Sequence, residues 1–178
     1  MDKLGQKNKD KVIDMLAERL QFERSGVKLY DAVLKKMQSS REPTISKMLD
    51  QMQEHRDQEK EHEEWLEECI RQLGGDAKQL TEKAKLVTQE SKGIEEVIMK
   101  DAEIPHLFHA LLAAELVDNA GWDLLVDLAD EADDTKAKRE FKKRLHEEEE
   151  HLILVREAMK KFAAHEVLGE KLQMPTQP

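Results

Sequence analysis

Residues 59–62 read Glu-Lys-Glu-His, and residues 148–151 read Glu-Glu-Glu-His. Each of these Glu-x-x-His segments lies on the apolar side of a stretch with helical periodicity, where leucine is usual. Because residues three apart share one face of a helix, each segment presents a carboxylate and an imidazole together. The two segments therefore predict helices that direct polar side chains into the interior of a helical protein.

A lone glutamate precedes each Glu-x-x-His segment, again on an apolar face. Glu23 is followed seven residues later by Tyr30, and Glu115 is followed seven residues later by Trp122. The interval from the lone glutamate to the Glu-x-x-His segment is 36 residues in the first half of the chain and 33 in the second. Since three residues are less than one helical turn, a loop can absorb the difference. The pattern predicts a pseudo-twofold repeat of two helix pairs.

Apolar residues spaced by threes and fours predict four long helices along the chain. Only 7 glycines and 4 prolines interrupt these stretches, which also favours helix. The helices are expected at about residues 10–38, 45–73, 104–132 and, after a turn at 133–135, up to about residue 162.

The connection between the second and third helices is long. Residues 76–102 show no sustained apolar face, so we expect a crossover with one or two short helices. A crossover of this length makes the second and third long helices parallel. The sequence thus predicts an all-α, up-down-down-up four-helix bundle in one domain over residues 1–165. The repeat halves are expected at about 10–75 and 104–162, with a C-terminal tail over 166–178 that frays toward its end.

The composition limits the classes of function. Charged residues make up 38% of the chain, against about 25% in an average globular domain, which points to helices with solvated charged faces. The formal net charge of −10 argues against nucleic-acid and anionic-membrane partners, because both select a basic surface. The same charge is suited to attracting cations.

Cysteine content and hydropathy indicate the compartment. The single cysteine, Cys69, excludes an intrachain disulfide and a four-cysteine iron or zinc module, and it fits a reducing environment. The first eleven residues are polar and contain no apolar signal core. The longest apolar stretches, such as residues 111–114, are too short to span a bilayer. We therefore expect a soluble, cytoplasmic protein.

Four interior glutamates and two interior histidines need compensation for their burial. Carboxylates are seldom fully buried unless a partner neutralises them. A pair of divalent ions would do so, and oxygen and imidazole donors suit Fe, Mn or sometimes Zn. The alternative is that these residues face solvent. This alternative is strongest for the glutamate run 147–150 and weakest for Glu23 and Glu115, which have apolar neighbours one turn away.

The joint pattern resembles the ferritin-like di-iron carboxylate superfamily, which includes ferritins, bacterioferritins and rubrerythrins. In that group, one glutamate from each of two helices and a Glu-x-x-His from each of the other two form the metal site. The likeness extends from Asp10 to about Phe162. It implies that two iron ions bind, with manganese as the alternative. The implied ligands are Glu23 and His62 for one ion, Glu115 and His151 for the other, and Glu59 and Glu148 as bridges.

Three further residues carry expectations from the same resemblance or from their place on the apolar faces. Tyr30 matches a tyrosine that packs and hydrogen-bonds near the metals in several family members. Asp118 occupies the place of an additional acidic ligand in rubrerythrin-type proteins, but its side chain is shorter. A ligand role and a helix–helix contact both stay open for it. His55 lies one turn before Glu59, either as a satisfied core histidine or as a ligand or proton relay.

The resemblance implies a redox function. The expected activity is oxidation of Fe(II), reduction of O2 or H2O2, or both, at a site in the middle of the bundle, and an external electron donor is compatible with it. The paired cysteines of a rubredoxin domain are absent from this chain. Two alternatives remain: a non-catalytic protein that binds or stores iron, and manganese-dependent dismutation of peroxide. The sequence leaves a homo-oligomer open.

Overall fold

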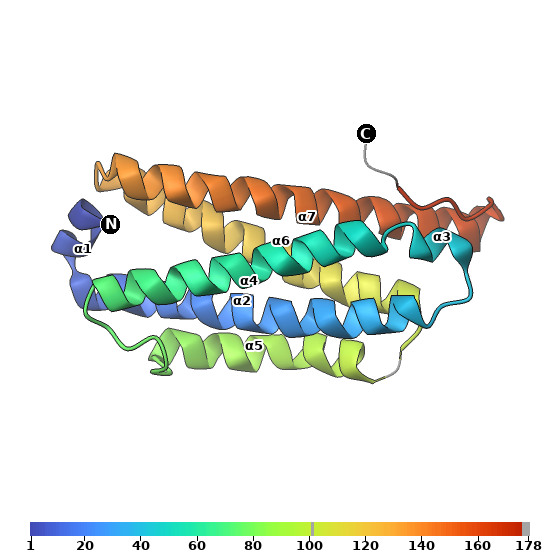
Figure 1. Cartoon of the computed structure of the whole chain (residues 1–178), viewed down its shortest axis with the longest axis horizontal. Coiled ribbons are helices and arrows are strands. Elements are labelled where there is room, and N and C mark those ends of the chain that lie inside the picture. Colours follow the sequence, from blue (N-terminus) through green and yellow to red (C-terminus); the bar gives the residue numbers. More distant parts are fainter. Residues whose placement is uncertain (101, 176–178) are drawn as a thin grey trace.

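The computed structural model describes residues 1–100 and 102–175, and this part of the chain contains helices and no strand. Figure 1 shows the whole molecule. The helices are α1 (Asp2–Lys7), α2 (Lys9–Gln38), α3 (Pro43–Ser46), α4 (Leu49–Gln72), α5 (Glu82–Met99), α6 (Ile104–Glu131) and α7 (Thr135–Leu168).

Four long helices form an elongated bundle, which confirms the all-α prediction. In Figure 1, α2 and α7 run in one direction, and α4 and α6 run in the other. The closest pairings are α2 with α4 and α6 with α7, so each half of the sequence repeat forms a helix hairpin. The expected up-down-down-up order is therefore present.

The core consists of two apolar clusters, one toward each end of the bundle. One cluster includes Leu29, Met52 and Phe108, and the other includes Leu20 and Phe141. Buried polar side chains occupy the layer between the clusters, close to the middle of each long helix. The fold thus encloses a polar layer between the two apolar clusters, which restrict access of water to it.

The second predicted helix is interrupted. A continuous helix was expected from residue 45 to residue 73, but α3 ends at Ser46 and α4 begins at Leu49. At the break, the Met48 N–H donates to the carbonyl of Ile45, three residues back, at 3.1 Å. This tighter turn buries both Ile45 and Met48.

The crossover contains one helix of 18 residues, α5, instead of one or two short ones. It packs against α2 and α6, alongside α2 in Figure 1. Its inward face consists of Ala84, Val87, Ser91 and Ile98. Because this face contains small and polar residues, its apolar periodicity is weak in the sequence.

Both ends of the described chain bury an apolar side chain. Helix α7 continues to Leu168 and ends at Gly169, whose φ of 67° is the left-handed conformation that glycine favours. Met174 then returns to the core and is 7% exposed, so the tail is not frayed there. At the other end, the polar N-terminus forms α1, which buries Leu4.

In the described part of the chain, no helix combines the length and the apolar character needed to cross a membrane.

Candidate metal centre

The six predicted ligands meet in the polar layer. Each long helix contributes from near its midpoint: α2 and α6 each supply one glutamate, and α4 and α7 each supply a Glu-x-x-His pair. No member of the set is more than 2% exposed, so the solvent-facing alternative is wrong for all of them. The set is Glu23, Glu59, His62, Glu115, Glu148 and His151.

The side chains lie close enough to share ions. Among the described residues there are three sets of side chains whose potential ligand atoms all lie within 4.8 Å of one another. Glu148 belongs to all three sets. The sets are Glu23, His62 and Glu148; Glu59, Glu115, Glu148 and His151; and Glu23, Glu59, Asp118 and Glu148.

Glu148 lies between the two imidazoles. Its Oε1 is 2.9 Å from Nδ1 of His62, and its Oε2 is 3.2 Å from Nδ1 of His151. Glu23 Oε2 lies 3.4 Å from Nδ1 of His62. On the other side, Glu59 Oε1 lies 3.4 Å from Nδ1 of His151. The Nδ1 atoms therefore both face the carboxylates, and the centre has two similar halves around one shared glutamate.

Many of these buried atoms lack a hydrogen-bond partner among the residues that the structure describes. They are one oxygen each of Glu23, Glu59 and Glu115, both oxygens of Glu148, and Nδ1 of each histidine. Buried polar atoms are almost always satisfied, and leaving one unpaired costs about 1–3 kcal/mol. Oxygen and imidazole donors converging without partners fit the coordination of divalent cations. The donor set could therefore hold a metal ion.

The aromatic residues of the sequence repeat bond across the two halves. The Tyr30 hydroxyl of α2 donates to Glu115 Oε1 of α6 at 2.5 Å. Conversely, Nε1–H of Trp122 on α6 donates to Glu23 Oε1 of α2 at 2.9 Å. Each lone glutamate thus has one oxygen fixed by the partner hairpin and the other directed to the centre. This reciprocal hydrogen bonding explains why Tyr30 and Trp122 each follow a lone glutamate by seven residues.

Asp118 makes the helix–helix contact considered for it, and it also lies in one potential ligand set. Its Oδ1 is 3.2 Å from Nη2 of Arg19, and its backbone carbonyl accepts from Arg19 Nη1 at 3.0 Å. Arg19 is 5% exposed and also lies 3.7 Å from Glu23. A Cβ at Gly121 would overlap Nη1 of Arg19, so that glycine makes room for the guanidinium. Arg19 was not predicted from the sequence, because an arginine on an apolar helix face usually extends its charged end into solvent.

His55 lies beside the centre but belongs to none of the potential ligand sets. Its ring stacks on His151 with centroids 4.2 Å apart, and it meets Tyr30 edge-on at 6.3 Å. Its Nδ1 is buried and has no hydrogen-bond partner, so it is not the satisfied core histidine of the first interpretation. Burial, followed by the charge of His151, lowers the pKa of His55 to about 3. His55 is therefore neutral in the folded protein at ordinary pH.

The outer nitrogens of the two ligand histidines have partners that the sequence interpretation did not identify. Nε2 of His62 lies 2.9 Å from Oε2 of Glu147, and Nε2 of His151 lies 2.8 Å from Oε1 of Gln58. Each partner directly precedes the Glu-x-x-His segment of the opposite hairpin. Aligning the two repeat halves could have singled out these positions.

The electrostatics identify Glu148 as the stable anion. Burial opposes its ionisation, but the charges of His151 and His62, whose Nδ1 atoms lie 3.2 and 2.9 Å from its oxygens, lower its pKa. Burial raises the pKa of Glu115 to about 8, where the charge of Glu148 adds to the effect and His151 opposes it. Burial and the charge of Glu148 also raise the pKa of Glu59 well above its usual value. Without a compensating cation, these two carboxyl groups retain protons.

The buried tyrosine stays neutral. Burial, followed by the charges of Glu115 and Glu59, raises the pKa of Tyr30 well above 10. Its hydroxyl is therefore a hydrogen-bond donor at the centre across the ordinary pH range.

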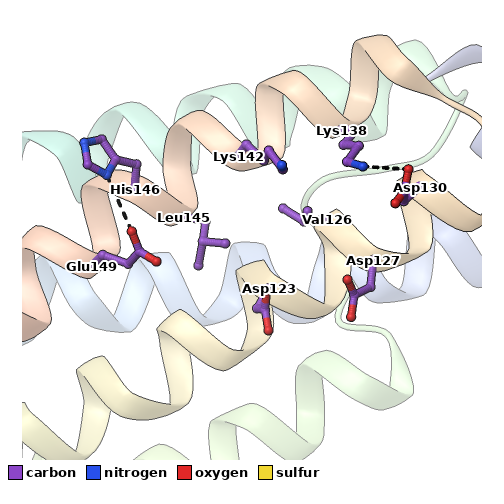
Figure 2. A pocket seen from close by; sticks show the side chains of 9 residues that line it. All are labelled: Asp123, Val126, Asp127, Asp130, Lys138, Lys142, Leu145, His146 and Glu149. Atoms are coloured by element: carbon purple, nitrogen blue, oxygen red, sulfur yellow. Dashed lines mark hydrogen bonds and ion pairs between the residues drawn. The ribbon is translucent and has the colours of Figure 1, made fainter.

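A groove of about 500 Å³ lies outside the centre, between α6 and α7. Figure 2 shows acidic side chains of α6 facing lysines of α7, with Lys138 paired to Asp130 at 2.6 Å. None of the six predicted ligands lines this groove. It is a charged surface feature, separate from the candidate metal centre.

Comparison with known proteins gives a family but no function. No curated protein and no solved structure matches the chain. A family model described as a domain of unknown function (DUF892) matches residues 7–168, which include all of α2 to α7 and every residue of the centre. The chain therefore belongs to the DUF892 family.

Proposed function

We propose that this chain is a ferritin-like dinuclear metal protein that binds two iron ions and oxidises Fe(II), reduces O2 or H2O2, or does both. The observation that supports the proposal most strongly is the convergence of unpaired carboxylate oxygens and imidazole nitrogens on Glu148. A packed protein interior seldom leaves so many buried polar atoms without a hydrogen-bond partner.

We name the two metal positions by their private ligands. Site A comprises Glu23 and His62, and site B comprises Glu115 and His151. Glu148 belongs to the potential ligand sets of both sites. Glu59 joins sets on both sides as well, so it and Glu148 are the proposed bridges.

Two bound Fe(II) ions would together supply two electrons, which suffice to reduce H2O2 to water or O2 to the oxidation level of peroxide. The protein residues have defined tasks around them. Tyr30 and Trp122 fix the orientation of the two lone glutamates through their hydrogen bonds. The apolar clusters on either side limit the access of water. Repeated turnover requires an electron donor from outside the chain.

Burial also sets a cost for metal binding. Glu59 and Glu115 hold protons in the metal-free protein because of their raised pKa values. Metal ligands must be deprotonated, so metal binding at the centre releases protons. The affinity of the centre for metal therefore increases as the pH rises.

Elemental analysis of the purified protein, followed by addition of Fe(II) in air, tests the proposal. We expect about two iron ions per chain and growth of an oxo-bridged ferric absorbance band. Glu148→Ala should abolish both, because this residue is common to all potential ligand sets. A chain that binds neither iron nor manganese would contradict the metal site. Binding of manganese with rapid O2 release from H2O2 would replace the iron oxidase by a peroxide dismutase, and binding without oxidation would leave a storage role.

A further inference from the structure

The two halves of the centre differ in charge at one pair of equivalent positions. His62 donates its outer N–H to Glu147, and His151 donates its outer N–H to Gln58. Glu147 and Gln58 correspond in the sequence repeat, because each directly precedes a proposed bridging glutamate. The repeat is thus nearly symmetric in geometry, but one histidine meets a carboxylate and the other a neutral amide.

This difference changes the donor strength of the histidines. Both partners accept a hydrogen bond from Nε2–H of the histidine, which leaves the lone pair of Nδ1 for the centre. A carboxylate partner makes the imidazole a stronger ligand than an amide does, and such partners change metal affinity by about 10- to 100-fold. His62 is therefore the stronger ligand of the two.

The remaining charges near the two sites do not cancel this difference. Near site A, Asp118 and Arg19 neutralise each other as an ion pair. Lys143 contacts Glu147 at 3.1 Å, but its side chain is 58% exposed and screened by water. The Glu147 carboxylate is consequently a negative charge at the outer nitrogen of His62 that has no equivalent at the outer nitrogen of His151.

We infer that Glu147 is a positioning residue that makes site A the tighter metal position, so that the first divalent ion binds there and the second at site B. This inference rests on the proposed function and specifies the order in which the centre is filled. It gives Gln58 the complementary role of keeping site B weaker and its ion easier to exchange.

The chain contains a reporter for this order. Its two tryptophans both lie on the side of site A: the Trp122 ring is 5.5 Å from the His62 ring, and Trp65 is 6.3 Å from Trp122. The single tyrosine, Tyr30, is instead 5.9 Å from the ring of His151 at site B. Quenching of tryptophan fluorescence by a paramagnetic ion therefore reports mainly on site A.

The test is an anaerobic titration with Co(II) alone, followed by calorimetry and tryptophan fluorescence. In the wild type, we expect two binding steps, with most of the quenching in the first. Glu147→Gln keeps the size and hydrogen bonding of the side chain but removes its charge, and should weaken the first step about 10- to 100-fold. Gln58→Glu should strengthen the second step, and the double variant should move most of the quenching to the second step.

Glu149→Gln is the matched control, because it removes the same charge from α7 at an exposed position that contacts His146 and no proposed ligand. Its binding constants should stay within about twofold of the wild type. If the wild type binds two Co(II) ions and Glu147→Gln behaves like Glu149→Gln, the inference is overturned while the proposed metal site stands. If the wild type binds no Co(II), both the inference and the proposed function are contradicted.

Discussion

At the scale of single residues, the two halves of the repeat differ three positions after each lone glutamate. The first half has Gly26 there, and the second half has Asp118. A Cβ at Gly26 would overlap Oε2 of Glu59 and approach its Cδ to 2.9 Å, so the missing side chain provides the space for this carboxylate. Asp118 fills the equivalent space in α6 and needs Arg19 as a counter-ion. The two halves therefore differ at this position because the Glu59 carboxylate needs space beside Gly26, whereas the Asp118 carboxylate needs the positive charge of Arg19.

Gly26→Ala should impair metal binding more than folding. The added methyl group must displace the Glu59 carboxylate, which is fully surrounded by other groups of the centre. We expect metal affinity to fall by roughly tenfold or more, measured by calorimetry with Co(II).

Gly93→Ala serves as the control for this substitution. Nothing lies within 4 Å of its added Cβ on α5. Removing a helical glycine there should stabilise the protein by about 0.5–1 kcal/mol and leave metal binding unchanged. Equal metal affinities for the two variants would show that Gly26 is not needed to place Glu59.

At the scale of elements, Asp134 joins the two ends of the chain. Its Oδ1 accepts from the Ala137 N–H at 3.0 Å and so caps α7. Its Oδ2 accepts from the backbone N–H groups of Lys3 and Leu4 at 3.0 and 3.1 Å, which satisfies the first turn of α1. One side chain therefore caps two helices that are more than a hundred residues apart.

Asp134→Ala should destabilise the protein by about 2–3 kcal/mol, since the loss of a cap costs about 1 kcal/mol and two more backbone donors lose their acceptor. Urea unfolding followed by circular dichroism measures the change. Asp130→Ala, which removes only an exposed ion pair with Lys138, should cost less than about 0.5 kcal/mol. A similar cost for both variants would mean that α1 is not held by Asp134.

The elements that could be predicted from the sequence are those with a wide apolar stripe. The bounds of α2 and α6 were predicted to within one residue because leucine and aromatic residues recur on their inner faces. The full length of α5 was not predicted, because its buried face includes Ser91 and Ala84 and therefore shows little apolar periodicity. The break between α3 and α4 depends on burying Ile45 and Met48 together, which is a matter of packing that periodicity does not encode.

The site divides in the same way. The burial and proximity of the six proposed ligands were predictable, because polar residues on apolar faces stand out against leucine. Glu147 was not, because it lies within a run of four glutamates whose other exposed members, Glu149 and Glu150, do face solvent. Only the crossing of α4 and α7 brings Glu147 against His62. Partners of ligands thus depend on helix geometry more than on sequence pattern.

At the scale of the whole molecule, the centre places like charges in the middle of the bundle, and stability should depend on how they are compensated. The folded protein holds a proton on Glu115 up to a pH of about 8, while the unfolded chain releases it near 4.5. The raised pKa therefore stabilises the fold at low pH, and this contribution is lost as the pH rises through about 8. Glu59 acts in the same direction.

His55 acts in the opposite direction at lower pH. Its pKa is about 3 in the folded state and near 6.5 in the unfolded chain, so unfolding takes up a proton below pH 6.5. Its contribution to stability is therefore complete above pH 6.5 and decreases below it. Above pH 7 the contribution of His55 is constant, and the pH dependence comes from groups with raised pKa values, which are Glu115, Glu59, His62 and His151.

We expect Glu115 alone to cost the metal-free protein about 1 kcal/mol of stability between pH 7 and pH 8, because the folded state loses a proton that the unfolded chain has already released. For a chain of this size, the melting temperature should fall by about 2–4 °C, measured by calorimetry in the presence of a chelator. Saturating metal should remove this dependence, because the ions replace the protons and bind more tightly as the pH rises. The metal-free Glu115→Gln variant should also show a smaller fall, since its side chain has no proton to release. A melting temperature that stays constant or rises from pH 7 to pH 8 in the metal-free wild type would mean that the carboxylates are compensated without metal. The folded chain would then have no electrostatic need for ions at its centre.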